Sequence, residues 1–176
     1  MSLRPLVSKE DHMQGNPDAP IELLEYGDYQ CPFCGRAYPI IKKLQLELGD
    51  RMKFIFRNFP LTTVHPQAML AAMASEAAAL QGKYWPMHDM LFENQRRLFK
   101  SAIMGYAEDL SLDLDKFGTD IKDEEIQKAI ELQFYGGMRS GVNATPGLFI
   151  NGEKLNSGWE GDELSKYIRD KYPQFM

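Results

Sequence analysis

The two cysteines of the chain, Cys31 and Cys34, are three positions apart and are its clearest candidates for chemistry. A structural disulfide gains most when it closes a long loop, and this pair would close almost none. Two thiols at this spacing, between a strand and a helix, favour thiol–disulfide exchange instead. The first thiolate attacks a disulfide, and the second cysteine resolves the mixed disulfide that forms.

The start of a helix would activate Cys31. Unpaired N–H groups and the positive end of the helix dipole lower the pKa of a thiol placed there. Pro32 suits the first helical position, because the N–H that it lacks would have no partner there. Cys34 then lies one turn further along, close enough to bond to Cys31 without a change in the backbone.

Two other interpretations of the pair stay open. One is a pair of inert buried thiols, although Cys-Pro-x-Cys at the start of a helix is poorly explained in that way. The other is a zinc site, which needs two further ligands. The candidates are three histidines, none paired at a metal-ligand spacing: His12, His65 and His88. We expect no metal and no organic cofactor, but a redox-active Cys31–Cys34 disulfide.

His65 and His88 are tempting as catalytic partners of the cysteines. His65 precedes Pro66 at a predicted helix start, and His88 lies on a helix of mixed apolar character. The exchange reaction needs no separate base once the thiolate has formed. We therefore expect both histidines to be structural or capping residues.

The segments around the cysteines predict a strand, a helix and a second strand. Residues 21–26 form a short apolar run, and apolar residues then recur at helical spacing from Pro32 to Gly49. Residues 52–59 predict the second strand. This order implies a right-handed crossover between parallel strands.

The middle of the chain predicts helices and no strand. We expect helices over residues 67–80, 84–99, 102–110 and 123–135. The acidic segment 108–125 is interpreted as the solvated outer face of a helical cap.

The last part of the chain returns to β structure. Residues 148–150 and 153–155 predict a hairpin, because Asn151-Gly152 suits a two-residue turn with positive φ at both positions. A final helix is expected over residues 162–171.

The composition excludes some classes of function. With 44% hydrophobic residues, the 176-residue chain can build a core without disulfides, and its net charge of −5 argues against nucleic acid or an anionic membrane as partner. The N-terminus has no apolar run like that of a signal peptide, and no stretch approaches the ~20 apolar residues of a membrane span. We expect a soluble, cytoplasmic protein, or a periplasmic one if a leader has been removed.

Three motifs, in this order, resemble those of the DsbA-like branch of the thioredoxin superfamily. They are LEYGDYQCPFC at residues 24–34, RNFPL at residues 57–61 followed by HP, and GVNATPG at residues 141–147. The resemblance extends from about residue 15 to the C-terminus. It implies an α/β thioredoxin fold with an inserted all-helical subdomain, and an enzyme that exchanges disulfides with proteins or peptides.

The resemblance also implies how the chain is divided. Residues 1–176 would form a single domain, with residues 15–63 and 143–176 as its thioredoxin part. The helical insertion would comprise residues 64–142 and would cap the side of the molecule that carries the cysteines.

Thr145-Pro146 is similar to the cis-proline loop that faces the cysteine pair in this family. By that resemblance Pro146 places no N–H against Cys31, and the backbone of Thr145 pairs with an extended substrate peptide. Pro32 and Phe33, between the two cysteines, are expected to contact the same substrate.

Glu25 is six residues before Cys31, where thioredoxin-fold enzymes carry a buried acidic residue. The resemblance implies that Glu25 takes and returns the proton of Cys34. Ile21, Leu23 and Glu25 alternate on one strand face, which supports burial, and a surface carboxylate at the strand end is the alternative.

Phe33 departs from the family's best-known strong oxidant, which has a histidine at this position. Phe33 can neither donate a hydrogen bond to the attacking thiolate nor place positive charge near it. We therefore hypothesise that the pKa of Cys31 is less depressed than in that relative, and that this protein is a weaker oxidant.

The expected partners are protein or peptide thiols and disulfides, together with an unidentified redox partner, and the chain itself is expected to be a monomer.

Two alternative functions are compatible with the same fold. One is a non-catalytic binding module that uses the cysteine pair as a redox sensor. The other is a thiol reductase of a small molecule such as glutathione or a peroxide, which would need a deep pocket beside Cys31. The direction of exchange depends on the reduction potential of the pair relative to that of its compartment.

Overall fold

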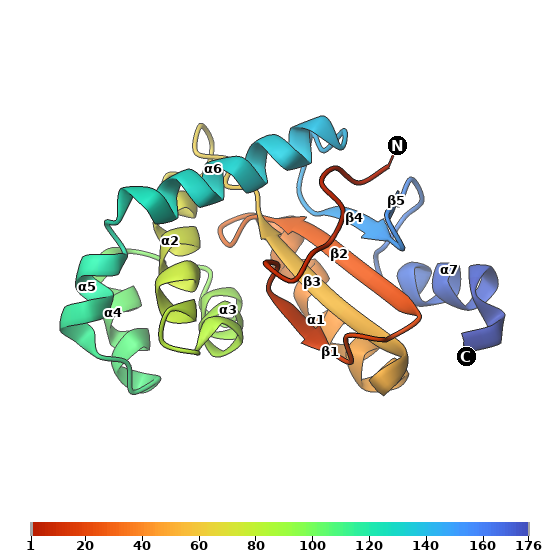
Figure 1. Ribbon diagram of the computed structural model, residues 1–176, viewed down its shortest axis with the longest axis horizontal. Helices are drawn as coiled ribbons and strands as arrows, with labels where there is room; N and C mark the ends of the chain where they lie inside the picture. Colours follow the sequence, from red (N-terminus) through yellow and green to blue (C-terminus); the bar gives the residue numbers. More distant parts are fainter. Residues whose placement is uncertain (1, 176) are drawn as a thin grey trace.

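The computed structural model describes residues 2–175, which fold around a five-stranded mixed sheet (Figure 1). The strands are β1 (Met13–Gly15), β2 (Ile21–Gly27), β3 (Met52–Asn58), β4 (Gly147–Ile150) and β5 (Glu153–Lys154), in the order β1-β3-β2-β4-β5. Strands β2 and β3 are parallel, as the sequence predicts, and the other pairings are antiparallel. Helix α1 (Pro32–Leu48) connects the parallel pair.

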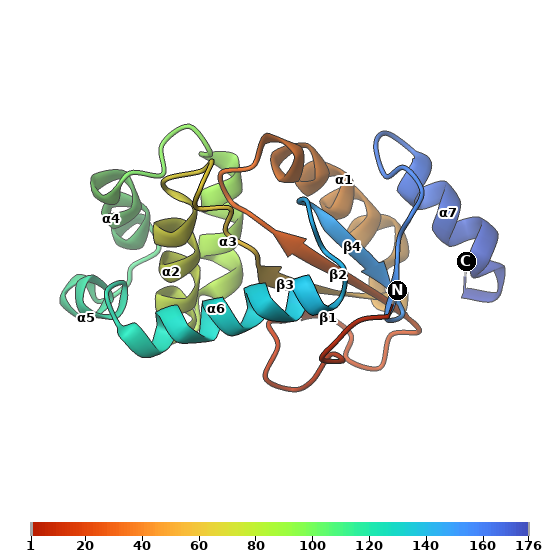
Figure 2. The same cartoon turned by 90° about the horizontal axis from the view of Figure 1, so that it is seen from above.

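The helices are named in chain order after α1. They are α2 (Ala68–Ala79), α3 (Tyr84–Glu93), α4 (Lys100–Asp109), α5 (Leu114–Asp120), α6 (Glu124–Arg139) and α7 (Glu163–Lys171), with 3-10 turns at Gly49–Arg51 and Pro173–Phe175. Helices α2 to α6 all lie between β3 and β4 in the chain, and α2 to α5 gather beyond one end of the sheet (Figures 1 and 2). The thioredoxin fold with a helical insertion is therefore confirmed.

The two faces of the sheet are covered differently. Helices α1 and α7 lie on one face, where Ile21, Leu23 and Phe54 join the main core. Helix α6 and the N-terminal segment lie on the other face, as Figure 2 shows from above. Because successive residues of a strand point to opposite faces, Glu25 shares the α1 face with Ile21 and Leu23.

Helix α6 continues beyond the end that the sequence predicts, through Gly136-Gly137 to Arg139. Glycines commonly follow a helix, but here they lie inside it and let it approach the sheet. A Cβ at Gly137 would lie 2.7 Å from the Phe59 ring, and one at Gly136 would lie 3.4 Å from Tyr26 Oη. The predicted end at Tyr135 is therefore wrong for a packing reason.

One further boundary differs from the prediction, and two short elements are additional to it. The helix expected over 84–99 ends at Glu93, where the Asn94 side chain donates to the Met90 carbonyl at 2.8 Å. Strand β1 and helix α5 were not predicted. Both are short, and α5 lies within the acidic segment, where Asp113 accepts a capping hydrogen bond from the Lys116 N–H at 2.9 Å. Some of the acidic residues in this segment therefore cap helices.

The predicted hairpin is confirmed. Its turn residues Asn151 and Gly152 have φ of 49° and 78°, as a type I′ turn requires. The Asn151 side chain also accepts from the Glu22 N–H at 2.7 Å, which ties the turn to β2.

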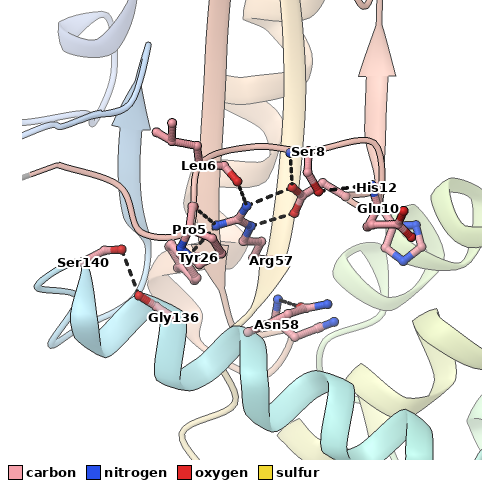
Figure 3. Close-up of polar contacts among 12 residues, drawn as sticks. Pro5, Leu6, Ser8, Glu10, His12, Tyr26, Arg57, Asn58, Gly136 and Ser140 are labelled. Atoms are coloured by element: carbon pink, nitrogen blue, oxygen red, sulfur yellow. Dashed lines mark hydrogen bonds and ion pairs between the residues drawn. The ribbon is translucent and has the colours of Figure 1, made fainter.

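Arg57 on β3 holds the N-terminal segment against the sheet (Figure 3). Its guanidinium donates to both carboxylate oxygens of Asp11, at 2.7 and 2.8 Å. It also donates to the carbonyls of Pro5 and Leu6, at 2.8 and 3.1 Å, and to Tyr26 Oη at 2.9 Å. Because the guanidinium is buried, this one side chain satisfies several polar groups that would otherwise lose water without a partner.

Candidate active site

Cys31 is the N-cap residue of α1, and its thiol is free and buried. Its pKa is lowered to about 5, chiefly by a hydrogen bond from the Cys34 thiol. The Thr145 side chain and the backbone N–H groups of Phe33 and Cys34 lower it further, while burial opposes them. The helix start therefore stabilises a thiolate at Cys31, as its position in the sequence indicates.

Cys34 has the opposite environment one turn further along the helix. Its side chain is fully buried, and burial is the main cause that raises its pKa well above the ordinary value. The hydrogen bond to Cys31 raises the pKa as well, because the Cys34 proton is the one that is shared. The Asp28 backbone N–H lies 3.5 Å from its sulfur. Cys34 is thus a thiol that holds its proton while Cys31 is a thiolate.

Glu25 is buried beneath the pair, so the alternative of a surface carboxylate is wrong. Burial raises its pKa to about 8, a hydrogen bond from Cys34 partly offsets this, and the charge of Cys31 adds to the increase. Its Oε1 atom has no hydrogen-bond partner within residues 2–175. A carboxyl group that changes protonation near neutral pH beside a protonated thiol can take and return the proton of that thiol.

The Thr145-Pro146 loop faces Cys31. The peptide bond between the two residues is cis, as the resemblance implies. The Cys31 thiol lies 3.6 Å from the Thr145 carbonyl oxygen. The Thr145 hydroxyl oxygen is buried and makes no hydrogen bond to any protein group in the described part of the chain. Thr145 can therefore contact the sulfur through its carbonyl when the sulfur is protonated and through its hydroxyl when it is ionised.

A cavity of about 390 Å³ lies beside Cys31, between the start of α1 and the Thr145 loop. Its rim is exposed at Pro32, Phe33 and Asn143, so it opens at the surface. The remaining wall includes Leu61 and His65, and the lining as a whole is mostly apolar. Thr145 lines the cavity and Pro146 does not.

Phe33 is 51% exposed, and the Arg36 guanidinium lies over its ring at 4.4 Å from the centroid. A positive charge does therefore lie close to position 33, although the aromatic ring and Glu160 both attract it. The Glu160 carboxylate accepts from Arg36 at 2.9 Å. This arrangement is one that the sequence pattern did not indicate.

Three residues near the pair were not predicted to act there. Gln95, after α3, donates to the carbonyls of Tyr29 and Cys31 at 2.7 and 3.0 Å, and so fixes the loop that carries the pair. Asp28 and His65 form a close pair beside the cavity. Asp28 could have been identified from the sequence, because it is only three residues before Cys31. Gln95 could not, because no sequence motif connects it with the cysteine pair.

His88 is buried among aromatic rings, with Tyr29, Phe56 and Phe92 within 6 Å, and it does not line the cavity. Burial lowers its pKa. This is the structural role that we expected for it. Among residues 2–175, no three or more His, Cys, Asp or Glu side chains cluster in a way that could hold a metal ion.

The chain resembles known proteins along almost its whole length. A family model described as thioredoxin matches residues 7–170. Among solved structures, alpha-DsbA1 of Wolbachia pipientis superposes with a TM-score of 0.84 at 24% identity, covering 97% of this chain and 95% of that one. Oxidised BdbD of Bacillus subtilis superposes with a TM-score of 0.81 at 24% identity, covering 97% and 96%. At this identity the likeness concerns the fold.

A curated relative, Na(+)/H(+) antiporter NhaA 1 of Salinispora arenicola, is 37% identical over 168 residues, which are 96% of this chain and 26% of that protein. The chain thus spans about a quarter of the length of such relatives. No helix in residues 2–175 has the length and apolar character needed to cross a membrane. The family match, the fold and the Cys31–Cys34 motif agree: the chain belongs to the thioredoxin family and has a DsbA-like fold.

Proposed function

We propose that this protein is a thiol–disulfide oxidoreductase that exchanges disulfides with protein or peptide substrates through Cys31 and Cys34. The observation that carries the proposal is the contrast between the two thiols. The pKa of Cys31 is lowered to about 5 and that of Cys34 is raised well above its ordinary value, although the two side chains share a hydrogen bond. Such a pair has one nucleophile that is ready at neutral pH and one thiol held in reserve.

The proposed reaction alternates between two forms of the pair. In the reduced form, the Cys31 thiolate attacks a substrate disulfide and forms a mixed disulfide. Cys34 then loses its proton to Glu25, attacks Cys31 and releases the reduced substrate. In the reverse direction a substrate thiol attacks the Cys31–Cys34 disulfide, and Glu25 returns the proton to Cys34. The pKa of about 8 for Glu25 suits both directions.

The cavity supports an extended peptide as substrate. Its rim is exposed, its lining is mostly apolar, and the Thr145 N–H makes no hydrogen bond within the described residues. A peptide in the cavity can pair with the backbone of Thr145 as an added strand, while Pro32 and Phe33 contact its side chains. An open site of this kind favours peptides over a small molecule enclosed in a deep pocket.

The antiporter relatives do not change this proposal. Those proteins are about four times as long as the region that matches this chain, and the matched part of this chain contains Cys31 and Cys34. We propose thiol exchange for this chain and no ion transport.

Trapping of the mixed disulfide tests the proposed function. The Cys34→Ser variant, incubated with a peptide that contains one disulfide, should accumulate a covalent adduct at Cys31, measured by intact mass. The Cys31→Ser variant is the matched control and should form little adduct, because its remaining thiol is buried and protonated. A wild-type protein that exchanges no faster than free cysteine would contradict the proposal and favour a redox-sensing binding module.

A further inference from the structure

Asp28 and His65 form a hydrogen-bonded pair that the exchange mechanism above does not use. The Asp28 side chain is fully buried, and its Oδ1 atom accepts from the Gln30 N–H at 2.8 Å. Its Oδ2 atom accepts from the Leu61 N–H at 2.9 Å and lies 2.8 Å from His65 Nδ1. Backbone donors therefore fix the carboxylate on both oxygens, and the carboxylate in turn fixes the imidazole.

This contact determines which nitrogen of His65 can accept a proton. A carboxylate that accepts from Nδ1–H holds the neutral imidazole in the tautomer whose Nε2 carries the lone pair. Nε2 makes no hydrogen bond to any group in residues 2–175. The His65 side chain is 19% exposed and lines the same cavity as Cys31 and Thr145. An accepting nitrogen is thus held at the place where a substrate thiol would enter.

The other residues of the cavity wall cannot replace it. Apart from His65 and the attacking Cys31, the lining side chains are apolar, hydroxyl or amide groups, which do not exchange protons near neutral pH. Glu25 is buried beneath the pair, where it contacts Cys34, and does not line the cavity. Pro32 and Phe33, the two residues between the cysteines, both line the cavity, and neither has a side chain that titrates.

We propose that His65 is a catalytic base and acid for the substrate sulfur, and that Asp28 is its positioning residue; this inference rests on the proposed function. When the protein donates its disulfide, the substrate S–H gives its proton to His65 Nε2, and the substrate sulfur bonds to Cys31 Sγ. The Cys31–Cys34 bond breaks, its electron pair passes to Cys34 Sγ, and Glu25 supplies the proton there. This step leaves a mixed disulfide between the substrate sulfur and Cys31. A second substrate thiolate then attacks the substrate sulfur of that bond and expels the Cys31 thiolate, so the substrate is oxidised to a disulfide and the pair is reduced. In the reverse direction, His65 protonates the departing substrate thiolate.

Two peptide probes distinguish this role from a structural one. A peptide with ordinary cysteines, whose pKa is about 8.5, is mostly protonated at pH 7 and needs a base. The same peptide with selenocysteines in place of its cysteines is already ionised at pH 7 and needs none. The oxidised His65→Gln variant should react at least about tenfold more slowly than wild type with the cysteine peptide, and less than about threefold more slowly with the selenocysteine peptide. Asp28→Asn should show the same selective loss.

His12→Gln is the matched control. His12 also pairs with a carboxylate, Glu76, at 2.7 Å, but it does not line the cavity, so both rates should stay within about twofold of wild type. Equal losses with both probes, or no loss with the cysteine peptide, would overturn the role of His65. If wild type reacts with neither probe, the proposed function itself fails. If His65→Gln does not fold, His65→Asn is measured with the same two probes and the same criteria.

Discussion

Gly35 and Gln95 are matched to each other, because a Cβ at position 35 would overlap the Gln95 side-chain amide. Gln95 comes from the helical region after α3, and Gly35 directly follows Cys34 in α1. The missing side chain at position 35 lets the Gln95 amide reach the carbonyls of Tyr29 and Cys31. The inserted helices thereby help to hold the loop that carries the reactive cysteine.

We expect the effect of Gly35→Ala to change sign with the residue at position 95. In a helix, Ala is more favourable than Gly by up to about 1 kcal/mol. With Gln95 present, the added methyl group displaces the amide. The Tyr29 carbonyl then loses its partner, and the Cys31 carbonyl keeps only the bond from the Gly35 N–H, so the variant should lose roughly 1 kcal/mol of stability. In a Gln95→Ala background the same change should be neutral or stabilising. Urea unfolding of the four oxidised proteins measures this, and an equal cost in both backgrounds would contradict the match.

The titration of Cys31 tests the electrostatics of the helix start. Thiolate absorbance near 240 nm should rise with a midpoint at about pH 5 in the reduced protein and be lost in Cys31→Ser. Phe33→His should lower the midpoint further, by about one pH unit, because a histidine can donate to the thiolate. A wild-type midpoint at or below pH 4, or no response to Phe33→His, would refute our hypothesis about Phe33.

Glu25 should make the oxidised protein less stable as the pH rises. Its folded pKa, about 8, is above the unfolded value of 4.5, so its contribution to stability is complete below pH 4.5 and is lost as the pH rises toward 8. The oxidised form is used because neither thiol titrates there and burial, the main cause of the raised pKa, persists. The loss should approach about 4 kcal/mol at pH 8.

Glu25→Gln should remove this slope and leave the protein more stable than wild type at pH 8. Glu22→Gln, on the same strand but partly exposed, is the control and should keep the slope. Urea unfolding at intervals between pH 4.5 and 8.5 gives the comparison. Parallel curves for wild type and Glu25→Gln would show that the carboxyl group titrates as an ordinary one.

Arg57→Lys should release the N-terminal segment. A lysine cannot reproduce the bidentate contact with Asp11 together with the bonds to the two carbonyls, so we expect a loss of about 2–4 kcal/mol in urea unfolding. Trypsin should also cut faster after Lys9. Arg51→Lys, whose guanidinium bonds to two carbonyls at the surface, should cost less than about 1 kcal/mol. Similar losses in both variants would contradict the conclusion that Arg57 holds the N-terminal segment against the sheet.

Much of the fold could be predicted because local patterns and packing agree in those segments. Strands β2 and β3 and helix α1 were found from their apolar spacing, and the Asn151-Gly152 turn from its need for positive φ. The end of α6 was missed because the role of Gly136-Gly137 depends on the distant rings of Tyr26 and Phe59. Local propensity cannot report such a contact.

The candidate site divides in the same way. Cys31 and Cys34 were proposed from a motif that directly follows a strand, and Glu25 from the resemblance to thioredoxin-fold enzymes. Gln95 could not be predicted, because 64 residues separate it from the Cys31 carbonyl that it contacts. The sequence favours a structural role for His65. The catalytic role that we propose rests on its contact with the Asp28 carboxylate and on its place in the cavity wall, and the sequence shows neither.

The reduction potential of the Cys31–Cys34 pair tests the central claim most directly. The oxidised and reduced forms are equilibrated in glutathione buffers and counted by mass after alkylation, with Cys34→Ser as the control. Because the low pKa of Cys31 stabilises the reduced form, we predict reversible behaviour with a potential between about −230 and −120 mV. A potential below about −300 mV, typical of a structural disulfide, or a pair that does not equilibrate, would contradict the account.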